Sequence, residues 1–253
     1  MSGGARTGGV QSVERSFALL ELLADAGGRA TLGELAARSG LPAPTIHRLV
    51  RSLVDGGYLR QEPSRAYALG PRLVRLGDGA GRLLGSWVQP ALAELVEATG
   101  ETANMAVLDG DRVVYLAQVP SKHSMRMFTE VGRRVHVHCT AVGKALVAQL
   151  CDAEVRALVG RAGMPAQTPN TMTDPDALMS HLRQVREQGY ATDEAEQELG
   201  VRCVAVPVLA GPAWVALSVS GPDARFTPEV RDRVVPVMQR SADELGRTLA
   251  SRG

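Results

Sequence analysis

The sequence predicts a two-domain α+β protein: a small helical module that ends in a β-hairpin, a linker helix, and a larger domain around an antiparallel sheet. Apolar residues recur at helical spacing through the first third of the chain, and two short strands flanking a polar turn follow them. The remainder alternates short apolar strands with helices. We expect a flexible tail over residues 1–9, the small module over 10–70, the linker helix over 71–87 and the larger domain over 88–253.

The composition is that of a globular protein, with 45% hydrophobic and 22% charged residues. No apolar run approaches the roughly 20 residues that span a bilayer, and the Gly-rich start lacks the apolar stretch of a secretory signal. These features predict a cytoplasmic protein. The three cysteines, Cys139, Cys151 and Cys203, lie far apart and give neither a disulfide framework nor a CxxC zinc pattern.

The net charge of +1 conceals an asymmetry along the chain. Residues 1–75 contain 10 Lys and Arg against 6 Asp and Glu, whereas residues 76–253 contain 18 against 21. The basic surplus therefore belongs entirely to the N-terminal third of the chain, which suits a surface that faces phosphate.

Two helices are predicted at the start of the small module. Val13, Phe17, Leu20 and Leu23 recur at helical spacing and predict a first helix that ends near residue 24. The sequence TLGE that begins at Thr31 is a capping-box pattern and opens a second helix. The sequence SGLP then gives a tight turn, in which the glycine takes the left-handed conformation.

A third helix is predicted to begin near Pro44, because proline fits the first helical position. Its apolar stripe consists of Ile46, Leu49, Val50 and Leu53. Since each residue turns the helix by about 100°, the opposite side carries basic and hydroxyl side chains.

A β-hairpin follows, with the polar sequence EPSR at its tip. A basic helix alone is better explained as the solvated side of an ordinary three-helix core. The ordered set of three helices and a basic-tipped hairpin is typical of a DNA-binding winged helix-turn-helix. The candidate DNA contacts are Arg15, Thr31, Thr45, His47, Arg48, Arg51 and Arg65.

Four motifs of this module resemble the IclR family of bacterial regulators: QSVER at 11–15, LAARSGLP at 35–42, TIHRL at 45–49 and YALG at 67–70. The resemblance extends over nearly the whole chain. It implies a GAF-like effector-binding domain after the winged helix-turn-helix, and binding to palindromic operator DNA as a homodimer or a homotetramer made of two dimers. Pro44 departs from the pattern of the family, which usually has a small hydroxyl residue there.

The linker has apolar residues at helical spacing, namely Leu73, Leu76, Leu83 and Leu84. By itself this pattern is compatible with a plain connector or with a helix that transmits motion or dimerises. The resemblance favours the dimerising role.

The larger domain begins with a predicted helix over residues 88–100, followed by two strands joined by an Asp-Gly turn. The strands are expected at 102–108, 112–117, 124–128, 201–208 and 214–219, and the further helices at 141–150, 152–159, 175–188 and 228–249. Hairpin strands flanked by helices predict an antiparallel sheet.

The sequences GETAN at 100–104, GKAL at 143–146 and SVSGP at 218–222 are similar, within the family, to the glyoxylate-responsive repressor subgroup of the allantoin pathway. The resemblance implies that the main-chain amides of Ala141 and Val142, at a helix start, hold the carboxylate of the effector. It places four side chains around the ligand: Asp193, Cys203, Ser218 and Ser220. Ala141 and Val142 stand where smaller residues are usual. A buried aspartate favours a small carboxylate with hydrogen-bond donors, such as glyoxylate, allantoate or another ureido acid.

Two other chemistries involve the same region. Cys203 with Asp193 resembles part of a thiol nucleophile, but no histidine lies nearby in sequence and no nucleophile motif surrounds the cysteine, so we expect no enzyme. His136, His138 and Cys139 are candidate metal ligands. In an extended strand the two histidines share one side and the cysteine faces away, so we expect neither a metal nor a cofactor.

The sequence therefore predicts a ligand-responsive transcriptional repressor of allantoin, purine-nitrogen or glyoxylate catabolism, released from its operator by a small carboxylate. The alternative is an activator or dual regulator of another organic-acid pathway from the same fold, because the sign of control depends on where the operator lies.

Overall fold

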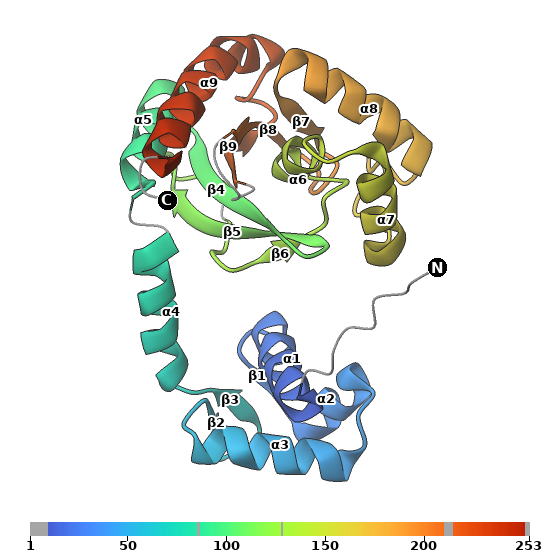
Figure 1. The fold of residues 1–253 in the computed structure, drawn as a ribbon. Coiled ribbons are helices and arrows are strands. Elements are labelled where there is room, and N and C mark those ends of the chain that lie inside the picture. The colour runs from blue at the N-terminus through green and yellow to red at the C-terminus, as the bar shows by residue number, and fades with distance from the viewer. Residues whose placement is uncertain (1–9, 85–86, 128, 210–214, 251–253) are drawn as a thin grey trace. The chain divides into compact units, whose positions relative to one another are not determined.

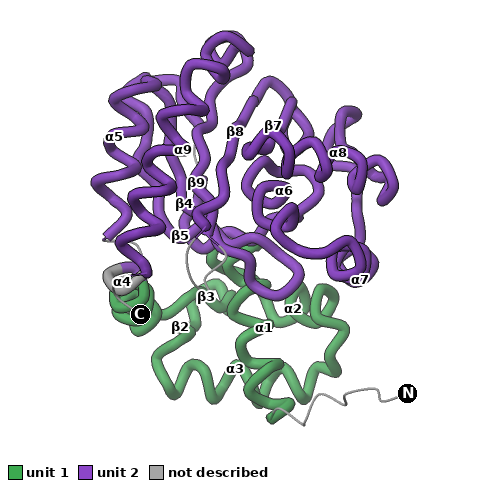
Figure 2. The backbone as a smooth tube through the Cα atoms, turned by 45° about the horizontal axis from the view of Figure 1, so that its top comes forward, with its two compact units in different colours: residues 1–80 green, residues 81–253 purple. Residues whose placement is uncertain are grey.

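The computed structural model describes residues 10–84, 87–127, 129–209 and 215–250. The expected tail over residues 1–9, the end of the expected linker at 85–86, Phe128 and Trp214 lie outside the described residues. The chain divides into two compact units, residues 1–80 and residues 81–253 (Figure 2). No helix among the described residues is long and apolar enough to cross a membrane.

The N-terminal unit consists of helices and a small sheet. In chain order its elements are α1 (Gln11–Asp25), β1 (Arg29–Ala30), α2 (Leu32–Ser39), α3 (Ala43–Asp55), β2 (Leu59–Gln61), β3 (Tyr67–Leu69) and α4 (Arg72–Leu84), which continues across the unit boundary. The three strands are antiparallel in the order β1-β3-β2. The sequence predicts the β2–β3 hairpin but not β1, which is only two residues long.

The core of this unit confirms the apolar stripe of α3 and corrects that of α1. The four residues of the predicted α3 stripe are buried: Ile46, Leu49, Val50 and Leu53. In contrast, Val13 and Phe17 on α1 are 49% and 61% exposed. Leu23 is buried as expected, and Leu19, which the sequence analysis did not include, makes the buried side of α1 with it. This side lies about a third of a turn away from Val13 and Phe17 at 100° per residue, so the first half of the expected stripe faces solvent.

Helix α2 begins with the capping box that the sequence predicts. The Thr31 hydroxyl accepts from the Glu34 main-chain N–H at 3.3 Å, and the Glu34 carboxylate accepts from the Thr31 N–H at 2.7 Å. The Thr31 N–H and hydroxyl both donate to the Glu34 carboxylate and hold the pKa of Glu34 below its usual range. The left-handed Gly40, at φ 64°, ends the helix as expected.

The C-terminal unit confirms the expected antiparallel sheet and thereby the α+β fold class. Its elements are α5 (Gln89–Thr99), β4 (Thr102–Asp109), β5 (Arg112–Val119), β6 (Arg134–Val135), α6 (Ala141–Val147), α7 (Asp152–Ala162), α8 (Pro175–Gln188), β7 (Ala191–Glu194), β8 (Val201–Val208), β9 (Val215–Pro222) and α9 (Pro228–Ala250). The six strands are antiparallel in the order β6-β5-β4-β9-β8-β7.

Helices cover both sides of this sheet (Figure 1). Helices α5 and α9 pack on one side over a core of valine, leucine and methionine side chains. Helix α6 packs on the other side against β7, β8 and β9, and α7 and α8 complete that second core.

The prediction of a strand over residues 124–128 was wrong for residues 124–127, the part that the structure describes. Residues 124–127 form bends and irregular backbone. Their carbonyl groups are bound by side chains rather than by a neighbouring strand: Arg225 donates to the Met125 carbonyl at 2.9 Å, and Thr102 donates to the Met127 carbonyl at 3.1 Å. Strands β6 and β7 were not predicted, and α6 ends three residues before the expected 150.

Replacing the cap of α2 tests the local analysis. We expect Thr31→Ala to lower the free energy of unfolding of the N-terminal unit by about 1 kcal/mol, because a main-chain N–H of the first turn loses its partner. Urea unfolding of the full chain measures this change. The control is Ser52→Ala, whose hydroxyl donates to the Arg48 carbonyl within a helix at 3.1 Å. Equal losses in both variants would show that the cap contributes nothing specific.

Candidate DNA-binding surface and effector site

The side of α3 opposite its core exposes basic side chains. His47, Arg48 and Arg51 are exposed, and Thr45 is half-buried at the flank, as the helical spacing predicts. Within the described parts of the chain, no carboxylate lies within ion-pair distance of Arg48 or Arg51. Their guanidinium groups are therefore available for an external anion.

The hairpin places Arg65 at the tip of the wing. Arg65 is exposed and has a φ of 65°, a left-handed conformation that is uncommon for arginine. Its main-chain N–H donates to the Glu62 carbonyl at 2.9 Å, and the Glu62 N–H donates to the Ala66 carbonyl at 2.8 Å. These two bonds close the tight turn that presents the side chain.

The other two candidate DNA contacts lie elsewhere in the unit. Arg15 is half-buried on α1 and, with Arg38, lines a hollow of about 390 Å³ between α1 and the end of α2. Thr31 is exposed, and its hydroxyl also donates to the Glu34 carboxylate at 2.8 Å. The capping box thus occupies the Thr31 hydroxyl in this structure.

The four expected effector side chains share one side of the central sheet. Asp193 pairs with Cys203 across β7 and β8, and Cys203 pairs with Ser220 across β8 and β9. Ser218 lies two residues before Ser220 on β9, so it points to the same side. All four are buried, and the Ser220 hydroxyl donates to the Cys203 sulfur at 3.1 Å. The structure therefore brings them together on the side that α6 covers.

Strands β4 and β5 extend this polar surface with residues that the sequence analysis missed. Thr102 pairs with Ser220, and Asn104 pairs with both Ser218 and Gln118. The Gln118 amide donates to the Asn104 Oδ1 at 3.1 Å, and the Asn104 Nδ2 lies 3.5 Å from the Ser218 hydroxyl. The alternation of polar and apolar residues along β4 was the available signal, but only the strand order connects it to β9.

Asp193 is held by the turn that follows it. Its Oδ1 accepts from the main-chain N–H groups of Glu196 and Gln197, at 2.7 and 3.4 Å. Burial raises the pKa of Asp193 to about 7, although the amide of Glu196 and the positive charge of Lys144 act in the opposite direction. Near neutral pH this carboxyl group can therefore accept a hydrogen bond as the anion or donate one as the acid.

The two buried cysteines near Asp193 are poor nucleophiles. Burial raises the pKa of Cys203 and of Cys139 to about 12, and the negative charge of Asp193 adds to both shifts. A thiol with this pKa remains protonated at neutral pH. The geometry thus offers no activated thiol at this site.

The start of α6 lies directly against the preceding turn. Ala141 and Val142 are fully buried, and the Thr140 hydroxyl accepts from the Gly143 N–H at 3.2 Å. A Cβ on Gly143 would lie 2.4 Å from the Val137 carbonyl, so only glycine allows this approach. The close packing explains why position 143 is a glycine.

The histidines before α6 do not lie in a strand, contrary to expectation. His136, His138 and Cys139 follow β6 in a bend and turn. The two rings contact edge to face with centroids 5.2 Å apart, while the Cys139 sulfur donates to the Gln197 side chain at 3.0 Å. The described residues contain no group of three or more His, Cys, Asp or Glu suited to a metal ion.

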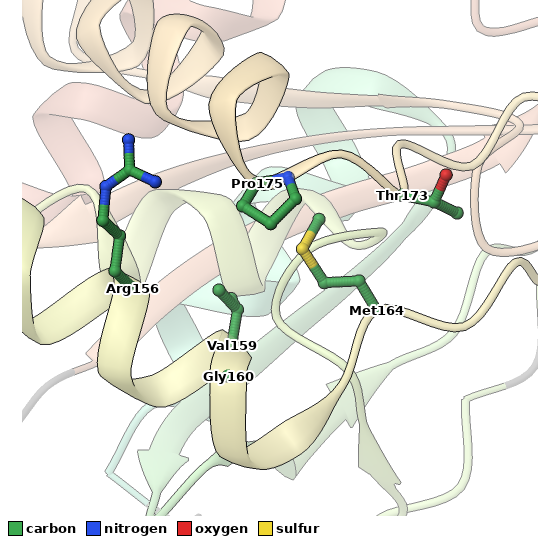
Figure 3. A pocket seen from close by; sticks show the side chains of 6 residues that line it. All are labelled: Arg156, Val159, Gly160, Met164, Thr173 and Pro175. Carbon is green, nitrogen blue, oxygen red and sulfur yellow. The ribbon is translucent and has the colours of Figure 1, made fainter.

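A surface cavity of about 370 Å³ lies where α7 meets the start of α8 (Figure 3). Its lining consists of Arg156, Val159, Gly160, Met164, Thr173 and Pro175. None of the expected effector residues contributes to it, so this cavity is separate from the polar surface under α6.

The raised pKa of Asp193 predicts a pH dependence of stability. The pKa of an aspartate in the unfolded chain is about 4, and that of Asp193 in the fold is about 7. The unfolded chain releases this proton first, so its contribution lowers the free energy of unfolding as the pH rises from about 4 to about 7, and no further above. We expect Asp193→Asn to show a smaller decrease across this window.

Urea unfolding at several pH values measures this difference. The control is Asp223→Asn, at an exposed position, which should keep the wild-type profile. An Asp193→Asn profile that coincides with the wild type between pH 4 and 7 would contradict the assignment.

Comparison with known proteins identifies the family. The chain matches the IclR helix-turn-helix domain over residues 12–63 and the bacterial transcriptional regulator IclR C-terminal domain over residues 84–247. It is 36% identical to the transcriptional repressor IclR of Escherichia coli, over 98% of this chain and 92% of that protein. The solved structure of an IclR transcriptional regulator from Alicyclobacillus acidocaldarius gives a TM-score of 0.84 at 31% identity, over 95% of this chain and 99% of that one.

The comparisons support the family more strongly than the expected allantoin-pathway subgroup. The HTH-type transcriptional repressor AllR of Salmonella typhimurium is 31% identical over 87% of this chain and 82% of that protein, which is less than the 36% of the Escherichia coli repressor. The matched domains and relatives are transcriptional regulators rather than enzymes, in agreement with the sequence analysis. The chain belongs to the IclR family of bacterial transcriptional regulators.

Proposed function

We propose that this protein is a repressor that binds operator DNA through α3 and the wing and is released when a small carboxylate binds under α6. The observation that carries the proposal is the cluster of buried polar side chains, Asp193, Cys203, Ser218 and Ser220, on the side of the sheet that α6 covers. Buried polar groups are costly unless they are paired, and recognition of a polar ligand accounts for their presence.

The DNA-binding half of the proposal rests on α3 and the hairpin. Arg48 and Arg51, three residues apart, lie on one side of α3, where a major groove offers guanine edges and phosphates. Thr45 and His47 flank them, and Arg65 at the wing tip reaches a neighbouring phosphate or the minor groove. Arg15 lies on α1 and Thr31 at the start of α2, and both are proposed to contact the DNA backbone.

We propose a homodimer, or a homotetramer of two dimers, as the form that binds DNA. Two copies related by twofold symmetry suit a palindromic operator. Phe17 on α1 and Val74 and Leu76 on α4 support this proposal, because they are large apolar side chains at least 55% exposed.

The effector half of the proposal follows from the chemistry of the polar surface. The hydroxyl groups of Ser218 and Ser220 supply donors for a carboxylate, together with the amides at Ala141 and Val142. Asp193 then either donates to the ligand as the acid or accepts from its hydroxyl or N–H groups as the anion. Glyoxylate, whose hydrate carries hydroxyl groups, and ureido acids such as allantoate meet both requirements. The similarity to AllR supports this assignment.

Arginine removal from α3 tests the DNA surface. We expect Arg48→Ala to weaken operator binding by roughly 1–3 kcal/mol, about 5- to 150-fold, without changing the affinity for the effector. A gel-shift titration at fixed salt measures the loss. The matched control is Arg183→Ala on α8, an exposed arginine of the other unit, which should leave operator binding unchanged. An unaltered affinity of the Arg48 variant would show that α3 presents another side to DNA.

The effector is tested by adding glyoxylate, allantoate and allantoin separately to the complex with the upstream region of the protein's own gene. We expect glyoxylate or allantoate to release the DNA, and allantoin, which has no carboxylate, to have no effect. The double variant Ser218→Ala/Ser220→Ala should need at least tenfold more ligand while binding DNA as the wild type does. Tight binding that none of the three compounds disturbs would discard the effector assignment and keep the DNA-binding function.

A further inference from the structure

A fully buried ion pair lies beside the proposed effector site. The Nζ of Lys144 on α6 donates to the Glu196 Oε1 at 2.6 Å, and the two side chains are 0% and 9% exposed. Burying two opposite charges costs several kcal/mol for each ion, and well-packed apolar residues often give equal or greater stability. Stability alone therefore gives no reason for this pair.

The pair connects α6 to the turn that holds Asp193. We call residues 193–197 the Asp193 turn. Glu196 and Gln197 both donate their main-chain N–H groups to the Asp193 carboxylate. The side chains of the same two residues reach the α6 region, where Glu196 meets Lys144 and Gln197 accepts from the Cys139 sulfur. Any movement of these two side chains is thus transmitted to the Asp193 carboxylate.

The opposite side of the Asp193 turn is fixed by two threonines. The Thr168 hydroxyl donates to the Ala195 carbonyl at 2.7 Å, and the Thr171 hydroxyl donates to the Glu196 carbonyl at 2.6 Å. Ala195 has a φ of 60°, which lies in the left-handed region that a non-glycine residue rarely adopts. The surrounding contacts therefore impose the shape of the turn.

The two oxygens of the Glu196 carboxylate differ in their hydrogen bonding. Oε2 is buried and has no hydrogen-bond partner among the residues that the structure describes. The Glu196 carboxylate is therefore held through Oε1, which accepts from Lys144 at 2.6 Å and more weakly from the Glu194 main-chain N–H at 3.5 Å. Without Lys144, a buried anion would remain with little compensation.

We propose that Lys144 and Glu196 are positioning residues of the effector site, which fix the separation between Asp193 and the start of α6. This inference rests on the proposed function, in which the effector bridges these two elements. Lys144 and Glu196 need not contact the ligand. By setting the distance between Asp193 and the start of α6, they determine which size of carboxylate compound binds.

The double variant Lys144→Met/Glu196→Met removes both charges at similar volume, so no unpaired buried ion is left. The matched control is Lys122→Met/Glu97→Met, which removes an ion pair of the same residue types whose side chains are 77% and 66% exposed. Calorimetry measures the affinities for glyoxylate and for the longer allantoate. Circular dichroism and an operator gel shift establish that each variant is folded and binds DNA.

We expect the ratio of the two affinities to change at least tenfold in the Lys144 double variant and less than twofold in the control. A folded Lys144 variant that keeps the wild-type ratio, whether both affinities are unchanged or fall equally, would overturn the proposal, because a general loss of packing affects both ligands alike.

A second measurement separates this inference from the effector assignment. If wild-type protein binds neither compound, the effector assignment fails, and amide hydrogen exchange then tests the positioning role directly. We expect faster exchange in the Lys144 variant for the peptide that covers residues 193–197, and unchanged exchange across the partner strands β8 and β9. Wild-type exchange rates in the Asp193 turn would refute the role.

Discussion

The pairing of β9 with β4 on one side and β8 on the other is the constraint on which the C-terminal unit depends. Ser218 and Ser220 lie opposite Asn104 and Thr102 across one ladder, while Ser220 lies opposite Cys203 across the other. Side chains alternate along a strand, so a shift by one residue would turn every polar group toward α5 and α9. The core and the candidate effector site are therefore fixed by one and the same register.

The two sides of the sheet carry different kinds of side chain. The side under α5 and α9 buries large apolar residues such as Met105, Val206 and Leu217, each of which contributes roughly 1.5–3 kcal/mol on burial. The side under α6 carries small and polar residues, including Ala205 and Ala216 beside the serines. Small side chains bring α6 close to the strands. The leucines and valines of the core on this side come mainly from α6, α7 and α8 rather than from the central strands.

Local signals in the sequence were sufficient to predict most helices and strands. The site residues that were missed are those that only long-range contacts bring to the site. Helix α8 and strand β8 were predicted to the residue, because a capping Asp174, a left-handed Gly189 and a run of valines mark their ends. The Lys144–Glu196 pair joins residues 52 positions apart, and no spacing rule connects them. The Asn104 amide likewise joins the site only through strand order. Asp193, Cys203 and the serines were expected from family resemblance rather than from spacing.

The glycines of helix α4 affect how easily this helix changes its conformation. It contains Gly77, Gly79 and Gly81, and added Cβ atoms at these positions would meet nothing within 4 Å among the described residues. Close packing therefore does not require these glycines. Each lowers helix stability by about 1 kcal/mol relative to alanine, so this segment unwinds and reforms at small cost. The segment that joins the two units is thus a helix that a change in either unit deforms at small cost.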